Sequence, residues 1–295
     1  MPMAESGKIQ PGVRAEYEVA SIADAQFGEV ARPLSAFERV WNQTGVRRLA
    51  VVAALALAWE IYGRTLNNPL MFPPFSEVSV AFYDAFTKGP LLGRMLTTLQ
   101  VLLIGYGCGL ALAAVFTTLA VSTRFGNDLL STLTAMFNPL PAIALLPLAL
   151  LWFGLGIPSL VFVIVHSVLW AVALNTHTGF KSVSETMRMA GQNYGLTGVR
   201  YVMAILIPAA FPSILAGLKI GWAFAWRTLI AAELVFGVSA RSGGLGWYIF
   251  ENRNLLETAN VFAGLLTVIV IGLFVEGVIF RAIEARTVRR WGMQR

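Results

Sequence analysis

The sequence predicts an all-α polytopic membrane protein, with six transmembrane helices and a further cytoplasmic helix between the fourth and the fifth. Of its 295 residues, 57% are hydrophobic and 13% are charged, whereas soluble domains are about 45–50% apolar and about 25% charged. The apolar residues form continuous runs, several of them close to the length of about 20 residues that crosses a bilayer as a helix. A membrane β-barrel would show alternating patterns instead, which argues against that fold class.

The chain begins with a polar segment, residues 1–46, which we expect to be a cytoplasmic tail. The first apolar run starts only after Arg47 and Arg48, so it is typical of a retained anchor and not of a cleaved secretory leader. The transmembrane region is then expected over residues 47–283, and a short basic cytoplasmic tail over residues 284–295.

Six apolar runs are predicted to cross the membrane, near residues 49–62, 96–121, 129–153, 159–174, 211–236 and 261–280. The third is the least regular, because Pro139, Pro141 and Pro147 each remove a backbone donor. Such breaks are tolerated where protein or water, rather than lipid, meets the freed carbonyls. We therefore expect this span in the interior of the bundle, with a simple kink as the equal alternative.

Lys and Arg are distributed unevenly over the segments that connect these runs. With the N-terminus inside, the inner segments hold fifteen of them, the outer segments hold five, and two lie within the fifth run. Because positive residues accumulate on the cytoplasmic side of membrane proteins, both termini are predicted to be cytoplasmic. The formal net charge of +6 then follows mainly from topology and requires no nucleic-acid partner.

The longest inner connection, about residues 175–207, is too polar to enter the membrane. Ser182 and Glu185, three residues apart, fit a capping box at the start of a helix. Gly195 and Gly198 provide a stop and a turn. We expect a short helix on the cytoplasmic face, which serves either as a docking element or as a structural interfacial helix.

Ionisable residues within spans usually face a cavity or a partner. Arg227 lies near the middle of the fifth span, and Glu233 lies 240° away from it around the helix, so the two do not pair. Either Arg227 lines a pathway and offers a positive charge to an anionic substrate, or it makes a structural hydrogen bond to carbonyls or to a carboxylate such as Glu60 or Glu276. Lys219, nearer the inner end, either has such a role or extends to the interface.

Two further polar residues complete the predicted pathway set, which is Asn138, His166, Arg227 and Glu233. For His166 in the fourth span, a satisfied packing role in the bundle is the alternative.

Features of enzymes and metal proteins are missing from the sequence. No phosphate-binding loop surrounds any of the four lysines, and His166 and His177 are too far apart for a metal pair. We expect no catalytic residues, no metal site and no bound cofactor in this chain.

One inner segment carries a family signature. Permease subunits of bacterial ATP-binding-cassette (ABC) importers have Glu-Ala-Ala, three residues, Gly, nine residues and then Ile-x-Leu-Pro. This chain has Met189-Ala190-Gly191, then Gly195, then Ile205-Leu206-Ile207-Pro208, with every spacing kept. It resembles that family but departs from it in Met189 for Glu, Gly191 for Ala and Ile207 for Leu. The lost acidic residue puts one polar contact to an ATPase in doubt, but not the docking geometry.

Other segments resemble one branch of these permeases, which carries nitrate, taurine, alkanesulfonates and bicarbonate. The similar segments are residues 72–78, 138–141, 146–148, 151–156, 217–221, 231–234 and 242–246. Together with the signature, the resemblance covers about residues 49–291.

The resemblance implies a permease that forms a pathway for a small anionic or zwitterionic solute in the bacterial inner membrane. The implied partners are a second copy of the chain, two ATPase subunits that hold ATP and magnesium, and an extracytoplasmic solute-binding protein. It also implies a coupling helix near residues 185–194. The predicted ATPase-coupling residues are Glu185, Arg188, Met189, Ala190, Gly191, Gly195, Ile205 and Pro208.

Alternatives stay open at this point. A secondary transporter of small organic anions would need no ATPase and would be favoured by inverted repeats, of which none is evident. A membrane-embedded enzyme would need a catalytic constellation that the sequence lacks. The N-terminal tail is either disordered, or an amphipathic elbow near residues 34–41, or a contact with the ATPase.

Overall fold

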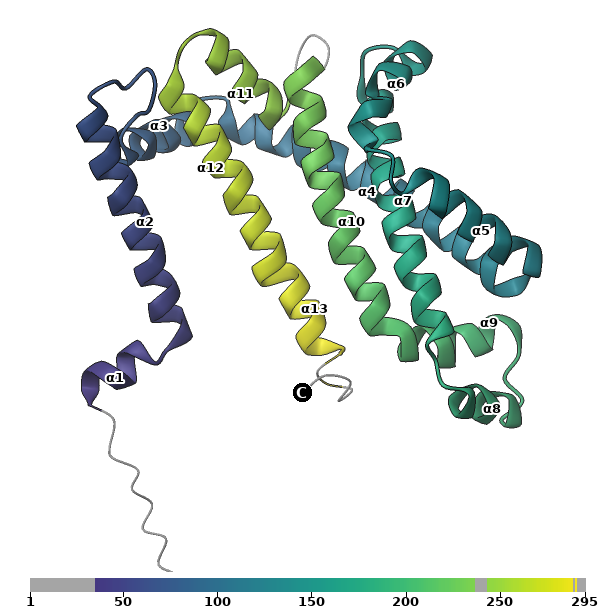
Figure 1. Ribbon diagram of the computed structural model, residues 1–295. Coiled ribbons are helices and arrows are strands. Elements are labelled where there is room, and N and C mark those ends of the chain that lie inside the picture. The colour runs from purple at the N-terminus through teal and green to yellow at the C-terminus, as the bar shows by residue number, and fades with distance from the viewer. Residues whose placement is uncertain (1–34, 237–242, 289, 291–295) are drawn as a thin grey trace, which may run out of the picture. The chain divides into compact units, whose positions relative to one another are not determined.

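The computed structural model describes residues 35–236, 243–288 and 290, and every regular element in that part of the chain is a helix (Figure 1). This confirms the all-α prediction. Five helical segments are long and apolar enough to cross a membrane: Thr44–Leu66, Leu91–Ser122, Ile157–Lys181, Val202–Val235 and Thr258–Arg286. A bent pair of helices makes a sixth if it is counted as one span.

The chain divides into two compact units, residues 1–54 and 55–295. The described part of the first begins with α1 (Ala36–Trp41), which falls in the predicted elbow. A capping box starts it: the Glu38 amide donates to the Ser35 hydroxyl, and the Ser35 amide donates to the Glu38 carboxylate at 2.8 Å. The remainder of the predicted tail, residues 1–34, lies outside the described residues.

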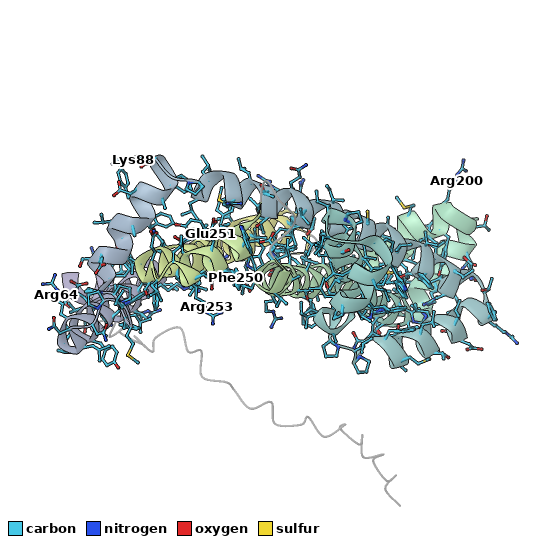
Figure 2. All side chains as sticks on the ribbon, turned by 90° about the horizontal axis from the view of Figure 1, so that it is seen from above. Arg64, Lys88, Arg200, Phe250, Glu251 and Arg253 are labelled. Carbon is cyan, nitrogen blue, oxygen red and sulfur yellow. The ribbon has the colours of Figure 1, made fainter. Side chains whose placement is uncertain are left out.

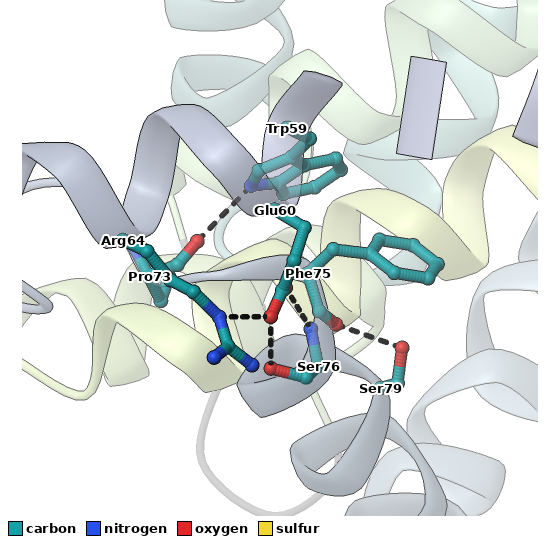
Figure 3. Close-up of polar contacts among 7 residues, drawn as sticks. All are labelled: Trp59, Glu60, Arg64, Pro73, Phe75, Ser76 and Ser79. Carbon is teal, nitrogen blue, oxygen red and sulfur yellow. Dashed lines mark hydrogen bonds and ion pairs between the residues drawn. The ribbon is translucent and has the colours of Figure 1, made fainter. Parts of the chain in front are cut away.

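In the second unit, Glu60 near the end of α2 (Thr44–Leu66) caps the helix that follows. The helix α3 (Phe75–Thr87) begins after Pro74, which supplies no side-chain cap. Instead the Glu60 carboxylate accepts hydrogen bonds from the amide and the hydroxyl of Ser76, both at 2.9 Å, and from Arg64 at 2.6 Å (Figure 3). A negative group at a helix N-terminus also interacts favourably with the helix dipole.

The core of the second unit is α7 (Ile157–Lys181), packed between α4 (Leu91–Ser122) and α10 (Ile207–Phe236). Glycines allow the close approach: a Cβ at Gly105 would lie 2.7 Å from Ile164, and one at Gly221 would lie 2.9 Å from Val172. Small residues that let helix backbones approach are typical of membrane bundles. As a result α7 is the most buried of the five candidate spans.

The third predicted span is not one continuous helix. α5 (Arg124–Phe137) is followed by the 3₁₀ turn η2 (Ala142–Leu145) and α6 (Leu146–Phe153), and the two parts meet at 88°. The irregularity that the prolines predict in this span is therefore present, and it is a break rather than a simple kink. The chain breaks at residues 138–141, because Pro139 and Pro141 lack the amide that would continue the helical hydrogen bonds.

The inner connection contains the predicted short helix, α8 (Glu185–Asn193), followed by α9 (Gly198–Tyr201). Its predicted cap is wrong by two residues. The hydroxyl of Ser184 accepts from the Met187 amide, whereas Ser182 donates its hydroxyl to Gly179 at the end of α7. The cause is that α7 continues seven residues beyond the predicted end of its span and so includes the first part of the connection.

The last two spans each contain a π-helical segment near the end that is predicted to be cytoplasmic. These segments are η3 (Val202–Leu206), directly before α10, and η4 (Val275–Phe280), between α12 (Thr258–Phe274) and α13 (Arg281–Arg286). Helix α11 (Leu245–Asn254) precedes α12. Lys219 of α10 forms an ion pair with Glu284 of α13 at 2.6 Å, so it has a partner within the bundle.

Candidate functional site

A cavity of about 360 Å³ lies where the broken third span meets α7 and α10. We call it the Arg227 cavity. It brings together Asn138, His166 and Arg227, three of the four residues predicted to line a pathway, from three separate elements. The residues that line it are Phe137, Asn138, Pro139, Leu140, Pro141, Ala142, Ile143, His166, Ser167, Trp170, Phe224, Arg227, Thr228 and Ala231.

The break at residues 138–141 shapes one wall of this cavity. Asn138 ends α5, where its amide donates to the carbonyl of Thr134 at 3.0 Å. Non-helical backbone at membrane depth is tolerated where it is buried in protein or lines a water-filled cavity. The prolines therefore do more than bend the span, because they leave irregular backbone beside the cavity.

Arg227 is exposed and has no acidic partner among the residues that the structure describes. Its Nε donates to the carbonyl of Ala223 at 3.1 Å, and its guanidinium lies 5.3 Å from the ring centroid of Phe224. Glu60, one suggested partner, is bound to Arg64 and Ser76 instead. An arginine has five N–H donors, so most of those on Arg227 remain available to a ligand.

His166 and Trp170, one turn apart on α7, present three unsatisfied nitrogens. Both ring nitrogens of His166 and the indole nitrogen of Trp170 are buried without a hydrogen-bond partner in the described part of the chain. Phe137 stacks on Trp170 with centroids 5.5 Å apart, and His166 lies edge-on to both rings. A buried polar group without a partner costs about 1–3 kcal/mol. Because these nitrogens have almost no accessible surface, an acceptor in the cavity would reach them only after a shift of the lining side chains.

The lining of the Arg227 cavity combines hydrogen-bond donors with apolar walls. Arg227 and Trp170 are donors only, and His166 can donate in either protonation state. Asp and Glu are absent from the described lining, while aromatic and aliphatic side chains form much of the wall. Sequence reasoning missed Trp170, although its position four residues after His166 on the same helix face was a usable signal.

Glu233 lies elsewhere, which corrects its predicted place in the pathway. Its side chain is 1% exposed, and the Thr98 hydroxyl donates to its carboxylate at 3.0 Å. The Gly246 amide donates to it at 2.9 Å, and the Leu245 amide donates to the Thr98 hydroxyl at 2.7 Å. Glu233 thus connects α10 to α4 and to the N-terminus of α11, a structural position that does not fit a pathway residue.

The close packing around Glu233 accounts for the glycines that precede and begin α11. A Cβ at Gly244 would overlap Glu233 and Thr98, and a Cβ at Gly246 would lie 2.6 Å from the Ile230 carbonyl oxygen. The glycines at positions 244 and 246 are therefore explained by the close approach of the backbone to a buried carboxylate.

On the side predicted to be cytoplasmic, α8 packs on the segment that leads into α10. A Cβ at Gly191 would lie 2.9 Å from Cγ1 of Ile205 and 3.1 Å from the ring of Tyr201. The glycine that replaces the alanine of the signature is thus required by the distance between α8 and η3. Arg188 fixes the other side of α8, because its guanidinium donates to the carbonyls of Phe180 and Val183.

Gly195 ends α8 in a Schellman motif. Its φ is +71°, its amide donates to Gln192 at 2.8 Å, and the next amide, that of Leu196, donates to Gly191 at 3.1 Å. A residue with a side chain would be strained in this left-handed conformation.

The other predicted coupling residues either are exposed or begin a helix. Glu185, Met189 and Ala190 are exposed on α8, and Pro208 occupies the second position of α10. Because Ile205 contacts Gly191, the two halves of the signature meet in space.

Comparison with known proteins places these features in a family context. Residues 105–289 match the family described as binding-protein-dependent transport system inner membrane component. The chain is similar to the taurine transport system permease protein of Escherichia coli, at 28% identity over 232 residues, which covers 75% of this chain and 81% of that protein. It is also similar to the nitrate import permease protein of a Synechocystis species, at 26% identity over 244 residues, or 80% and 87% of the two chains.

Proposed function

Because this chain belongs to the family of binding-protein-dependent transport system inner membrane components, we propose that the Arg227 cavity is part of its solute pathway. The chain is a multi-pass permease component of an ABC importer of the nitrate, taurine and sulfonate branch, a transport component rather than an enzyme. The observation that supports the proposal best is the convergence on one cavity of an arginine without an acidic partner and three unsatisfied buried nitrogens.

The proposed cargo is a small organic sulfonate or carboxylate, with or without an amino group. Taurine and nitrate, named for the relatives, share negatively charged oxygens that an arginine and an indole N–H would bind. The volume of about 360 Å³ lies within the range of organic-ligand sites, about 300–1,000 Å³. A planar inorganic anion would leave the walls formed by Phe137, Trp170 and Phe224 without contact, so an anion with an apolar portion fits better.

We propose that α8 couples this pathway to a separate ATPase. Met187 and Met189 on α8 expose 45% and 48% of their surface, and Tyr194, directly after the helix, exposes 86%. This helix lies outside the candidate spans, and such exposed apolar residues are expected of a protein-docking surface. A displacement of α8 would reach Ile205 through Gly191, and Ile205 belongs to the π-helical segment that continues into α10, the helix that carries Arg227.

The proposed assembly is a homodimer with two ATPase subunits on the cytoplasmic side, where both termini lie, and a solute-binding protein on the outer side. Charged residues near the proposed outer ends of the spans support an outer docking surface (Figure 2). Lys88 at the end of α3 and Arg253 on α11 are exposed, whereas Glu251 on α11 is half-buried and paired with Arg94. ATPase closure would move α8 and convert an inward-facing pathway into an outward-facing one, which requires two states that bind the partners differently. A secondary transporter, the alternative, would give α8 no such role.

Charge-selective labelling of the cavity tests the pathway proposal. With Cys108 replaced by Ser, a Thr228→Cys variant places a thiol in the lining of the Arg227 cavity. We expect it to react faster with an anionic sulfonate-bearing methanethiosulfonate than with the trimethylammonium analogue, because Arg227 attracts the anion. Adding Arg227→Gln should remove this preference.

The matched control is Val115→Cys, which is 62% exposed on α4 but does not line the cavity. We expect it to react with neither reagent in a bilayer. A Thr228→Cys thiol that stays unreactive, or that shows the same charge preference with and without Arg227, would refute the pathway proposal.

A further inference from the structure

A second cavity, of about 480 Å³, lies at the inner ends of the helices and is separate from the Arg227 cavity. We call it the inner basic cavity. Its walls come from the end of α4, the start of α5, the last turns of α7, one residue of α8 and Leu206 before α10. The residues that line it are Ala120, Val121, Ser122, Thr123, Arg124, Asn127, Asp128, His177, Phe180, Lys181, Arg188 and Leu206. Helix α8 lies close to the lower end of α7 (Figure 1).

Positive charge dominates this cavity. Arg124, Lys181 and Arg188 line it against a single carboxylate, Asp128, and none of the three cations forms an ion pair within the described ranges. Asp128 accepts from the Asn127 side chain at 3.1 Å. Arg188 gives two of its donors to carbonyls of Phe180 and Val183, and three remain. Positive residues on this side of a span are common, so the charge alone would not define a site.

His177 supplies the second, independent observation. Its side chain is only 7% exposed, it lines the cavity, and it has no hydrogen-bond partner in the part of the chain that the structure describes. A largely buried imidazole that makes no hydrogen bond within the protein depends on the contents of the cavity for a partner. It carries at least one N–H in either protonation state, so an acceptor in the cavity would satisfy it.

We infer that the inner basic cavity binds a phosphate group, carried by an anionic lipid of the inner leaflet or by a soluble phosphate. The free donors belong to guanidinium, ammonium and imidazole groups, and a phosphate offers several acceptor oxygens with one or two negative charges. The apolar parts of α4 and α7 end at this level, beside Ser122 and Lys181, where lipid headgroups lie. Basic pockets between helix ends on the cytoplasmic side bind such headgroups in other membrane proteins.

A bound phosphate would contact α5, α7 and α8 together. Because Arg188 is part of both the inner basic cavity and the attachment of α8, the ligand would hold α8 against the end of α7. The site would therefore tune the coupling helix without touching the cargo.

Lipid retention by the assembled importer tests this inference. The complex is solubilised from membranes that contain phosphatidylglycerol, washed in neutral detergent and examined by native mass spectrometry. We expect each wild-type permease chain to retain phosphatidylglycerol. An Arg124→Gln/Lys181→Gln variant should bind this lipid at least about tenfold more weakly, because two charge-assisted contacts are lost. Both residues are exposed, so folding should be unaffected, and Lys181→Arg should retain the lipid.

The control is Arg200→Gln, which removes an exposed inner cation that does not line the cavity and that lies at the edge of the helices (Figure 2). A parallel titration with inorganic phosphate, in phosphatidylcholine nanodiscs, distinguishes the two sources. If the wild type binds inorganic phosphate but retains no lipid, and the double variant no longer binds phosphate, the site is assigned to a soluble phosphate. If neither probe binds, or if the double variant binds both probes as well as Arg200→Gln does, the inference is wrong.

Discussion

Arg227 has structural features of both roles that its sequence position left open. Its Nε is bound to a carbonyl of its own helix, as in a structural role, while its guanidinium borders a cavity with His166 and Trp170. The hydrogen bond to Ala223 uses one donor and restrains the side chain, and the other four donors remain available to the proposed solute. Holding a charged group in place before the ligand arrives lowers the cost of binding.

Glu233 provides a residue-scale prediction about stability. Glu233→Gln keeps the shape of the side chain but places an amide where Thr98 and Gly246 both donate. The Gln oxygen at the position of Oε2 can still accept from both donors, but the amide nitrogen then replaces Oε1, whose one hydrogen-bond partner in the described residues is the donating Thr98 hydroxyl. The new buried N–H groups lack an acceptor there, so we expect the free energy of unfolding to fall by about 1–3 kcal/mol. Thermal unfolding of the purified permease in detergent measures this.

The control for that prediction is Glu77→Gln, an exposed carboxylate on α3 for which we expect a change within about 0.5 kcal/mol. Equal melting temperatures of Glu233→Gln and Glu77→Gln would contradict the structural role.

Single residues also show what the sequence could and could not predict about the site. Arg227, His166 and Asn138 stand out because they are polar in apolar runs, and the structure brings them to one cavity. Glu233 stands out in the same way but faces α11, which its angle on the helix could not reveal. Trp170 was missed because a tryptophan in a span is most simply explained by packing, and only its unsatisfied nitrogen distinguishes it.

At the scale of elements, the proposed coupling depends on the contact between α8 and η3. Gly191 touches Ile205 without an intervening side chain, and Gly195 ends α8 where a turn is needed. The signature in the sequence is therefore a packing pattern: the small residue and the isoleucine are spaced so that they meet.

Gly191→Ala tests this contact. Alanine is intrinsically better than glycine in a helix by about 0.5–1 kcal/mol, but its methyl group would lie 2.9 Å from Ile205, and such overpacking typically costs about 1–3 kcal/mol. We expect fewer solute molecules transported per ATP hydrolysed, because α8 must shift away from η3. The measurement is uptake and ATP turnover in the same proteoliposomes.

Two comparisons make that result specific. Gly107→Ala, where nothing lies within 4 Å of the added Cβ, should leave the number of solute molecules transported per ATP unchanged. Gly191→Ala/Ile205→Ala should restore part of the transport per ATP that Gly191→Ala loses. An unchanged ratio in Gly191→Ala would show that this contact does not transmit the movement.

The elements also show where sequence patterns fail. Prolines marked the third span as irregular, yet the choice between a kink and an 88° bend depends on what packs in the corner, which is α7 and α10. The cap of α8 was misplaced because Ser182 and Ser184 are both plausible caps. The length of α7, set by packing against α10, decided between them.

At the scale of the whole molecule, composition predicted the class of protein and the structure shows how the apolar residues are used. Many large apolar side chains are exposed, such as Leu55, Leu57 and Ile61 on α2 at 66%, 61% and 55%. Such surfaces are stable against lipid or a partner subunit but not in water. Basic residues indicated the orientation, whereas the inner basic cavity could not be seen in their distribution, because it needs the ends of three helices to meet.

ATP-driven uptake by the complete importer tests the central claim, that an anion passes Arg227 in a pathway coupled to an ATPase. Proteoliposomes with the permease, its ATPase and its binding protein are assayed with labelled taurine, methanesulfonate and benzoate, for wild type, Arg227→Lys and Arg227→Gln. We predict that the wild type takes up at least one of these anions, and only with ATP. Arg227→Lys should retain much of this uptake. Arg227→Gln should lower the uptake by about tenfold or more, because a charge-assisted contact is lost. Uptake that continues without ATP, or that is unchanged in Arg227→Gln, would contradict the account.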